Sequence, residues 1–214
     1  MIIHNLNYGY PKECNLCNGN ETPDHPNVVL TVEPFEKEGN SFKLMLVGQD
    51  PTIFNNPGRV EKVLMLNEKN GQLAKWLKRL FGEKQFTEFS IYATNLVKCT
   101  FPKPPSVYKS KDFLKPYFDN CNTYLKAEIQ NYKPNLLLSF GEPAHRMIIT
   151  IFDNESLFND KMQDAFTGQF FKAKINDFTF DYSPCLHIKT FRVAETYGNS
   201  VVKFKEELNR FLMK

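Results

Sequence analysis

Short apolar runs alternate with amphipathic segments through the middle of this chain, and the alternation limits the folds that it can adopt. Continuous apolar, β-rich runs predict strands over Phe42–Gln49, Phe89–Val97 and Asn135–Phe140. Apolar residues at helical spacing predict helices over Asn70–Gly82 and Phe113–Tyr132, and from Gly141 onward. Because parallel strands need crossover connections, which helices usually provide, the pattern predicts a parallel sheet covered by helices.

The two ends of the chain depart from this alternation. The first forty residues are polar and broken by prolines, which predicts an irregular arm with at most one strand, at Val28–Val32. Gly168–Tyr182 predicts a β-hairpin that turns at Asn176-Asp177, and Asn199–Met213 predicts a closing helix. With 214 residues, of which 42% are hydrophobic, the chain is long enough for one well-cored domain and short for two. We therefore expect one domain over residues 1–214, with the arm at residues 1–40.

Composition excludes some classes of protein and leaves others open. The 27 basic and 24 acidic side chains give a net charge of +3, which permits a nucleic-acid partner without indicating one. No apolar stretch approaches the roughly 18 residues of a membrane span, and the first residues lack the pattern of a signal peptide. We expect a soluble, cytoplasmic, monomeric protein. The five cysteines would then face a reducing compartment, where metal or cluster ligation is commoner than disulfides.

Polar side chains follow three of the predicted strands. Asp50 comes directly after the first strand, Asn95 lies at the end of the second, and His187 follows the last strand of the hairpin. Strands of a parallel sheet that end at one edge share a crevice there. A carboxylate, an amide and an imidazole in one crevice suit acid–base chemistry and hydrogen bonding to a ligand. Taken singly, each residue also has an ordinary structural interpretation, as a turn, loop or partly buried side chain.

These residues belong to three segments that occur in a fixed order, Gly48-Gln49-Asp50-Pro51, Thr94-Asn95-Leu96-Val97-Lys98-Cys99 and His187-Ile188-Lys189-Thr190-Phe191-Arg192. In this form the chain resembles the uracil-DNA glycosylase superfamily, and its amino-terminal cysteines resemble the iron-sulfur (family 4-like) branch. The resemblance extends from Cys14 to about Arg192. It implies a three-layer α/β/α sandwich with a central, mostly parallel sheet. It also implies a DNA glycosylase that hydrolyses the N-glycosidic bond of uracil or another deaminated or damaged base.

The resemblance assigns a role to each residue of the crevice. Asp50 would position or deprotonate water and stabilise the developing sugar cation. Asn95 would bond the Watson-Crick edge of the extruded base, with Gln49 also in the base-binding group. His187 would donate toward the base carbonyl that gains charge as the bond breaks.

The same resemblance extends to the surroundings of the base. Phe54 is the aromatic candidate for stacking on it, although the iron-sulfur branch has its stacking phenylalanine near the position of Leu64-Met65-Leu66. Lys189 and Arg192 would lie near the backbone of single- or double-stranded DNA. The closing motif departs from the family, because Ile188 replaces the proline that normally follows the histidine.

The cysteines form a second candidate site. Cys14 and Cys17 are a chelating pair, and the resemblance places Cys99 and Cys121 as third and fourth ligands of a [4Fe-4S] cluster, with zinc as the alternative. Cys121 also fits a small core residue on the apolar side of a helix. Cys185, two residues before His187, leaves open a nucleophilic Cys/His pair.

Two other functions remain open from the sequence. A basic segment with Lys98, Lys103, Lys109 and Lys111 around Tyr108 is either a loop that holds DNA phosphates or ordinary solvated surface. The chain could therefore be a non-catalytic, nucleic-acid-binding relative that keeps the fold and the metal site. A zinc-stabilised hydrolase of free nucleosides or nucleotides is the third interpretation.

Overall fold

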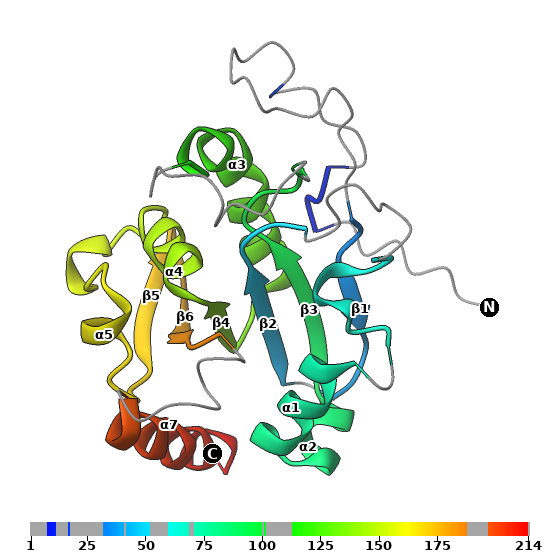
Figure 1. Cartoon of the computed structure of the whole chain (residues 1–214), viewed down its shortest axis with the longest axis vertical. Helices are drawn as coiled ribbons and strands as arrows, with labels where there is room; N and C mark the ends of the chain where they lie inside the picture. The colour runs from blue at the N-terminus through cyan, green and yellow to red at the C-terminus, as the bar shows by residue number, and fades with distance from the viewer. Residues whose placement is uncertain are drawn as a thin grey trace.

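The structure is a computed structural model that describes residues 8–11, 17, 32–40, 42–51, 60–68, 71–99, 101, 113–187 and 197–213. Within these ranges the strands form one six-stranded sheet in the order β1-β3-β2-β4-β6-β5 (Figure 1). The strands are β1 Phe35–Lys37, β2 Lys43–Gly48, β3 Ser90–Asn95, β4 Leu136–Phe140, β5 Phe171–Ile175 and β6 Phe178–Cys185. The four central strands are parallel, and β1 and β5 pair antiparallel at the two edges.

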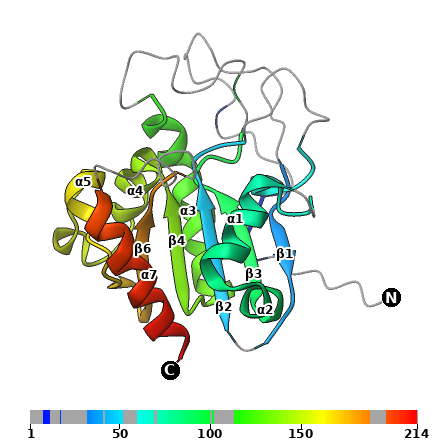
Figure 2. The same ribbon diagram turned by 60° about the horizontal axis from the view of Figure 1, so that its bottom comes forward.

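Helices cover both faces of this sheet. They are α1 Gln72–Phe81, α2 Glu83–Glu88, α3 Lys115–Tyr132, α4 Glu142–Ile149, α5 Met162–Ala165 and α7 Gly198–Leu212, with 3-10 turns η2 Val63–Met65 and η4 Glu155–Leu157. One apolar cluster contains side chains of α3 and α4, and the other contains side chains of α1, α2 and α7. Figure 2 shows α1 and α7 in front of the strands and α3 behind them. The predicted three-layer α/β/α sandwich is confirmed.

The apolar run of β2 explains why this strand lies in the middle of the sheet. Leu44, Met45, Leu46 and Val47 are all fully buried. Successive side chains of a strand point to opposite faces, so Leu44 and Leu46 enter the cluster under α1 while Met45 and Val47 enter the cluster under α3. A strand that is covered on both faces needs continuous rather than alternating apolar character.

The structure changes one prediction at the amino-terminal side and adds a helix after another. The strand that it describes there is β1, which follows Pro34 and pairs with β3, whereas residues 28–31 of the predicted strand lie outside the described ranges. The helix predicted to end at Gly82 does end there, at a backbone φ of 86° that favours glycine. A second short helix, α2, follows at once, in a stretch for which the sequence predicted no element.

The carboxyl-terminal predictions are confirmed. β5 and β6 form the hairpin, and Asn176 takes the left-handed conformation of its turn with φ 52°. α7 is the closing helix. Among the described residues, no helix is long and apolar enough to cross a membrane.

Candidate active site at the carboxyl edge of the sheet

The ends of β2 and β3 hold two predicted site residues side by side. Gly48 and Asn95 are in register as the last pair of the two strands. The pairing then continues beyond the sheet, because the Leu96 N–H donates to Gly48 O at 2.9 Å and the Val97 N–H donates to Gln49 O at 3.1 Å. The loop that carries Asp50 therefore starts against the segment that follows Asn95.

Asp50 is a buried carboxyl with one oxygen in use. Its side chain is 7% exposed, and Oδ1 accepts a hydrogen bond from Gln49 Nε2 at 2.9 Å. Oδ2 is buried without a hydrogen-bond partner among the described residues. Burial raises the pKa of Asp50 to about 7, and the Gln49 hydrogen bond opposes that shift only in part. The site therefore holds a carboxyl that changes charge near neutral pH and has an oxygen available for a ligand.

Asn95 is the second buried polar side chain with an unused acceptor. It is 3% exposed, and its Oδ1 also has no partner within the described part of the chain. A Cβ atom at Gly48 would lie 2.5 Å from Asn95 Oδ1 and 3.0 Å from Leu64 Cδ2. Glycine at position 48 therefore leaves the space that the Asn95 amide occupies.

This close approach predicts the effect of Gly48→Ala. The added methyl group must displace the Asn95 amide, and overpacking of this kind typically costs about 1–3 kcal/mol in the free energy of unfolding. Gly198→Ala is the matched control, because no described atom lies within 4 Å of the position of its Cβ. Urea denaturation should show a lower midpoint for Gly48→Ala and an unchanged or higher midpoint for Gly198→Ala. An unchanged midpoint for Gly48→Ala would contradict the packing.

The turn η2 borders the same site. Leu64 and Met65 have φ values of 59° and 53°, which non-glycine residues rarely adopt, and such strain tends to gather at functional sites. The Leu64 side chain lies against Gly48, so an aliphatic group borders the Asn95 amide. Phe54 lies outside the described residues.

His187 lies at the same edge of the sheet but farther along it. Its strand, β6, pairs with β4, and the Gly141 N–H donates to Cys185 O at 2.9 Å where the two strands end. β4 separates β6 from β2, so the axes of these two strands are about 10 Å apart. The His187 side chain is exposed, whereas Asp50 and Asn95 are buried. Lys189 and Arg192 lie outside the described ranges.

Three of the four candidate ligand cysteines lie in one apolar cluster. Cys17, Cys99 and Cys121 are each 1% exposed and belong to the cluster under α3. Asn120, next to Cys121, donates from Nδ2 to Cys17 Sγ at 3.4 Å, which attaches this part of the arm to α3. Buried thiols that converge from three segments suit thiolate ligation in chemical type. The described residues contain no group of three metal-ligating side chains arranged as a metal site, and Cys14 lies outside them.

Cys185 differs from these cysteines in its surroundings. It is fully buried at the end of β6, and burial raises the pKa of its thiol well above the usual range. A nucleophilic cysteine needs accessible thiolate, so the geometry disfavours the Cys185–His187 pair as a nucleophile and its base.

The interpretation of Lys98 as part of an exposed basic loop is wrong. Its side chain is 1% exposed and forms an ion pair with Glu128, which is fully buried on α3, at 2.6 Å. Glu128 lies between Leu125 and Ile129 on the buried face of that helix. A glutamate at an apolar helix position was the sequence signal for a buried partner. Lys103, Lys109 and Lys111 lie outside the described ranges.

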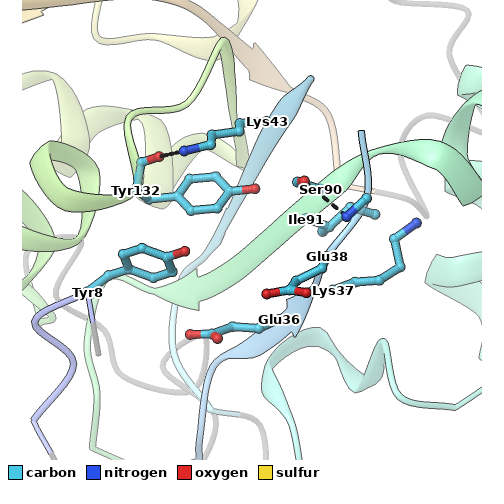
Figure 3. A pocket seen from close by; sticks show the side chains of 9 residues that line it. Tyr8, Glu36, Lys37, Glu38, Lys43, Ser90, Ile91 and Tyr132 are labelled. Carbon is cyan, nitrogen blue, oxygen red and sulfur yellow. Dashed lines mark hydrogen bonds between the residues drawn. The ribbon is translucent and has the colours of Figure 1, made fainter. Parts of the chain in front are cut away.

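A hollow of about 270 Å³ lies at the opposite ends of the same strands (Figure 3). Its lining includes Lys43 and Ser90, the first residues of β2 and β3. The hydroxyl groups of Tyr8 and Tyr132 and the carboxylate of Glu36 point toward one space there. Five residue steps along β3 separate Ser90 from Asn95, about 17 Å in a strand. This hollow is therefore separate from the site around Asp50.

A comparison with family models finds one described as "Uracil DNA glycosylase superfamily", which matches residues 36–209. The match starts in β1, ends in α7 and includes Asp50, Asn95 and His187, whereas Cys14 and Cys17 precede it. No curated protein matches the chain.

Proposed function

Because this chain belongs to the uracil DNA glycosylase superfamily, we propose that it hydrolyses the N-glycosidic bond of uracil, or of another deaminated or damaged base, in DNA. One observation carries the proposal. Asp50 Oδ2 and Asn95 Oδ1 are the buried side-chain polar atoms without a hydrogen-bond partner among the described residues, and they come from adjoining strand ends. A buried acceptor without a partner costs about 1–3 kcal/mol, which a ligand or water that donates to it recovers.

The unused acceptor of Asn95 suits a base that presents an N–H group. A base inside a duplex is out of reach, so it must be extruded into a pocket that bonds its edge. Asn95 Oδ1 accepts from the base edge, and Gln49 remains hydrogen-bonded to Asp50 beside it. Leu64 provides an apolar surface next to the amide.

Asp50 and His187 would act on the glycosidic bond itself. Ionised Asp50 orients a water molecule through Oδ2 and stabilises the positive charge that develops on the sugar. The imidazole of His187 donates toward the base oxygen that gains negative charge as the bond breaks. The exposure of His187 supports a contact with a DNA strand that lies over the edge of the sheet. Lys189 and Arg192 would contact the phosphates of that strand.

The pKa of Asp50 predicts a pH dependence for this reaction. The water-orienting form is the carboxylate, which predominates only above the pKa of about 7. We expect the single-turnover excision rate to rise about tenfold per pH unit below that pKa and to level off above it. The measurement is abasic-site formation in uracil-containing single- and double-stranded DNA between about pH 5.5 and 9, with Asp50→Asn as the control that lacks the rise. A rate that falls with increasing pH would contradict the role of Asp50.

The second candidate function is nucleic-acid binding without chemistry. Two features favour it, namely the exposure of His187 and the replacement of the following proline by Ile188. Binding of uracil-containing DNA without any abasic product would support this alternative and rule out the glycosylase. Release of uracil from free deoxyuridine alone would instead indicate a nucleoside hydrolase.

We also propose that Cys14, Cys17, Cys99 and Cys121 hold a [4Fe-4S] cluster, with zinc as the alternative. Bound there, the metal group would cross-link the arm, the segment after β3 and α3. Cys121→Ser should then lose any absorption near about 400 nm and lower the melting temperature, while Cys185→Ser keeps the absorption. Iron and zinc analysis of the purified protein distinguishes the two metals. If the purified protein contains neither iron nor zinc and melts at the same temperature as Cys121→Ser, both metal assignments are refuted.

A further inference from the structure

We propose that the buried Lys98–Glu128 ion pair positions Asn95 for base recognition, an inference that rests on the proposed glycosylase function. Lys98 Nζ donates to Asn95 O at 2.6 Å, to Thr94 Oγ1 at 2.7 Å and to Glu128 Oε2 at 2.6 Å. An ammonium group has three donors, so all of them are used. One of the three bonds goes to the backbone of the residue that we propose reads the base.

Glu128 fixes the ammonium group in this place. Its Oε2 accepts from Lys98, while Oε1 accepts from the Tyr92 hydroxyl at 2.7 Å and from Thr94 Oγ1 at 2.9 Å. Lys98, Glu128 and Thr94 are each at most 1% exposed, so water does not compete for these bonds. The network therefore ties the end of β3 to α3 through fully satisfied polar groups.

The peptide group that links Asn95 to Leu96 is held at both ends. Its carbonyl accepts from Lys98 Nζ, and its N–H donates to Gly48 O at 2.9 Å. This peptide sets the backbone direction at Asn95, where β3 ends. Asn95 is followed by a bend rather than by more strand, so no further strand pairing fixes its direction.

The ion pair lies on the face of the sheet opposite the Asn95 side chain. Side chains alternate along a strand, so Tyr92 and Thr94 face Glu128 on the α3 side while Asn95 points to the other face, toward Gly48. The network can therefore hold the Asn95 backbone without occupying its amide. Oδ1 stays unbonded among the described residues, as its proposed bond to a base requires.

Stability alone gives a weak reason for this arrangement. Replacing a buried ion pair with well-packed hydrophobic side chains of similar volume is often neutral or stabilising, because two charges no longer need to be desolvated. Removal of both charges should therefore leave the fold intact and loosen Asn95. The paired variant Lys98→Met/Glu128→Gln does this, since the Gln amide oxygen can still accept from Tyr92 and Thr94.

The test compares base selectivity rather than activity alone. We expect Lys98→Met/Glu128→Gln to lower kcat/KM for the preferred base about 10- to 100-fold, mostly in kcat, and to lower its preference over thymine by a similar factor. In an Asn95→Ala background the paired substitution should cost little more, because its effect acts through Asn95. Lys115→Met/Asp119→Asn, which removes an exposed ion pair of α3, is the matched control and should keep both values.

The outcomes separate this inference from the proposed function. Suppose that the unmodified protein excises a base. If the paired variant then keeps its base selectivity, or if its loss of kcat/KM adds in full to that of Asn95→Ala, the positioning role is wrong and the glycosylase assignment stands. If the unmodified protein excises no base, the positioning role and the glycosylase function are both wrong. Faster hydrogen exchange at the Leu96 amide in the paired variant is expected. An unchanged exchange rate would contradict the role without reference to activity. Glu128→Gln alone serves the same comparisons if the paired variant does not fold.

Discussion

Asp50→Asn is expected to lower the rate of base excision strongly and, at the same time, to make the protein more stable at neutral and alkaline pH. The loss of activity follows from the loss of the carboxylate that orients water, and groups of this kind contribute about 10²- to 10⁴-fold to rate. The substitution keeps the size of the side chain and its oxygen for the Gln49 hydrogen bond. Single-turnover excision from uracil-containing DNA measures this loss.

The gain in stability follows from the direction of the pKa shift. The carboxyl has an ordinary pKa of 3.8, and burial raises the pKa of Asp50 to about 7 in the folded protein. The folded state therefore binds the proton more tightly than the unfolded state, and the free energy of unfolding falls as the pH rises between these two values. Each pKa unit corresponds to 1.36 kcal/mol, so the full cost above about pH 7 is on the order of 4 kcal/mol.

Asparagine does not ionise, so the variant escapes this cost. Its advantage in the free energy of unfolding should be largest above about pH 7 and should disappear below about pH 4. Denaturant unfolding of the variant and of the unmodified protein at a series of pH values measures the difference. If Asp50→Asn is less stable than the unmodified protein at about pH 8, the desolvation cost assigned to the Asp50 carboxylate is wrong.

The sequence was informative where local pattern determines structure. The run Leu44–Val47 predicts a buried strand because covering helices remove water from both of its faces. Asp50 and Asn95 could be placed at one edge because parallel strands end together. The edge strand β1 was missed because three residues, Phe35–Lys37, carry too little pattern and depend on pairing with β3.

Interactions across the fold could not be read from local pattern. Lys98 lies 30 residues before Glu128, and only the packing of α3 behind β3 brings them together. The role of Gly48 likewise depends on its register with Asn95, since the space that a side chain would take belongs to a neighbouring strand. The burial of Asp50, which sets its pKa, comes from the same three-dimensional arrangement.

Lys98→Met alone should destabilise the protein by about 3–5 kcal/mol, because it leaves the charge of Glu128 buried without its partner. The loss arises from an uncompensated charge rather than from a missing contact, so removing the second charge should reverse most of it. Lys98→Met/Glu128→Gln is therefore expected to unfold within about 2 kcal/mol of the unmodified protein.

Chemical denaturation of the single and paired variants tests this order of stabilities. The exposed ion pair Lys115–Asp119 on α3 is the reference. Lys115→Met should lower the free energy of unfolding by no more than about 1 kcal/mol. If the paired variant is as unstable as Lys98→Met, the ion pair itself stabilises the fold, and the bond from Lys98 to the Asn95 carbonyl is incidental to that role. If only the single variant is unstable, the fold tolerates the loss of both charges. The function of the charged group behind Asn95 is then to position that residue rather than to stabilise the fold.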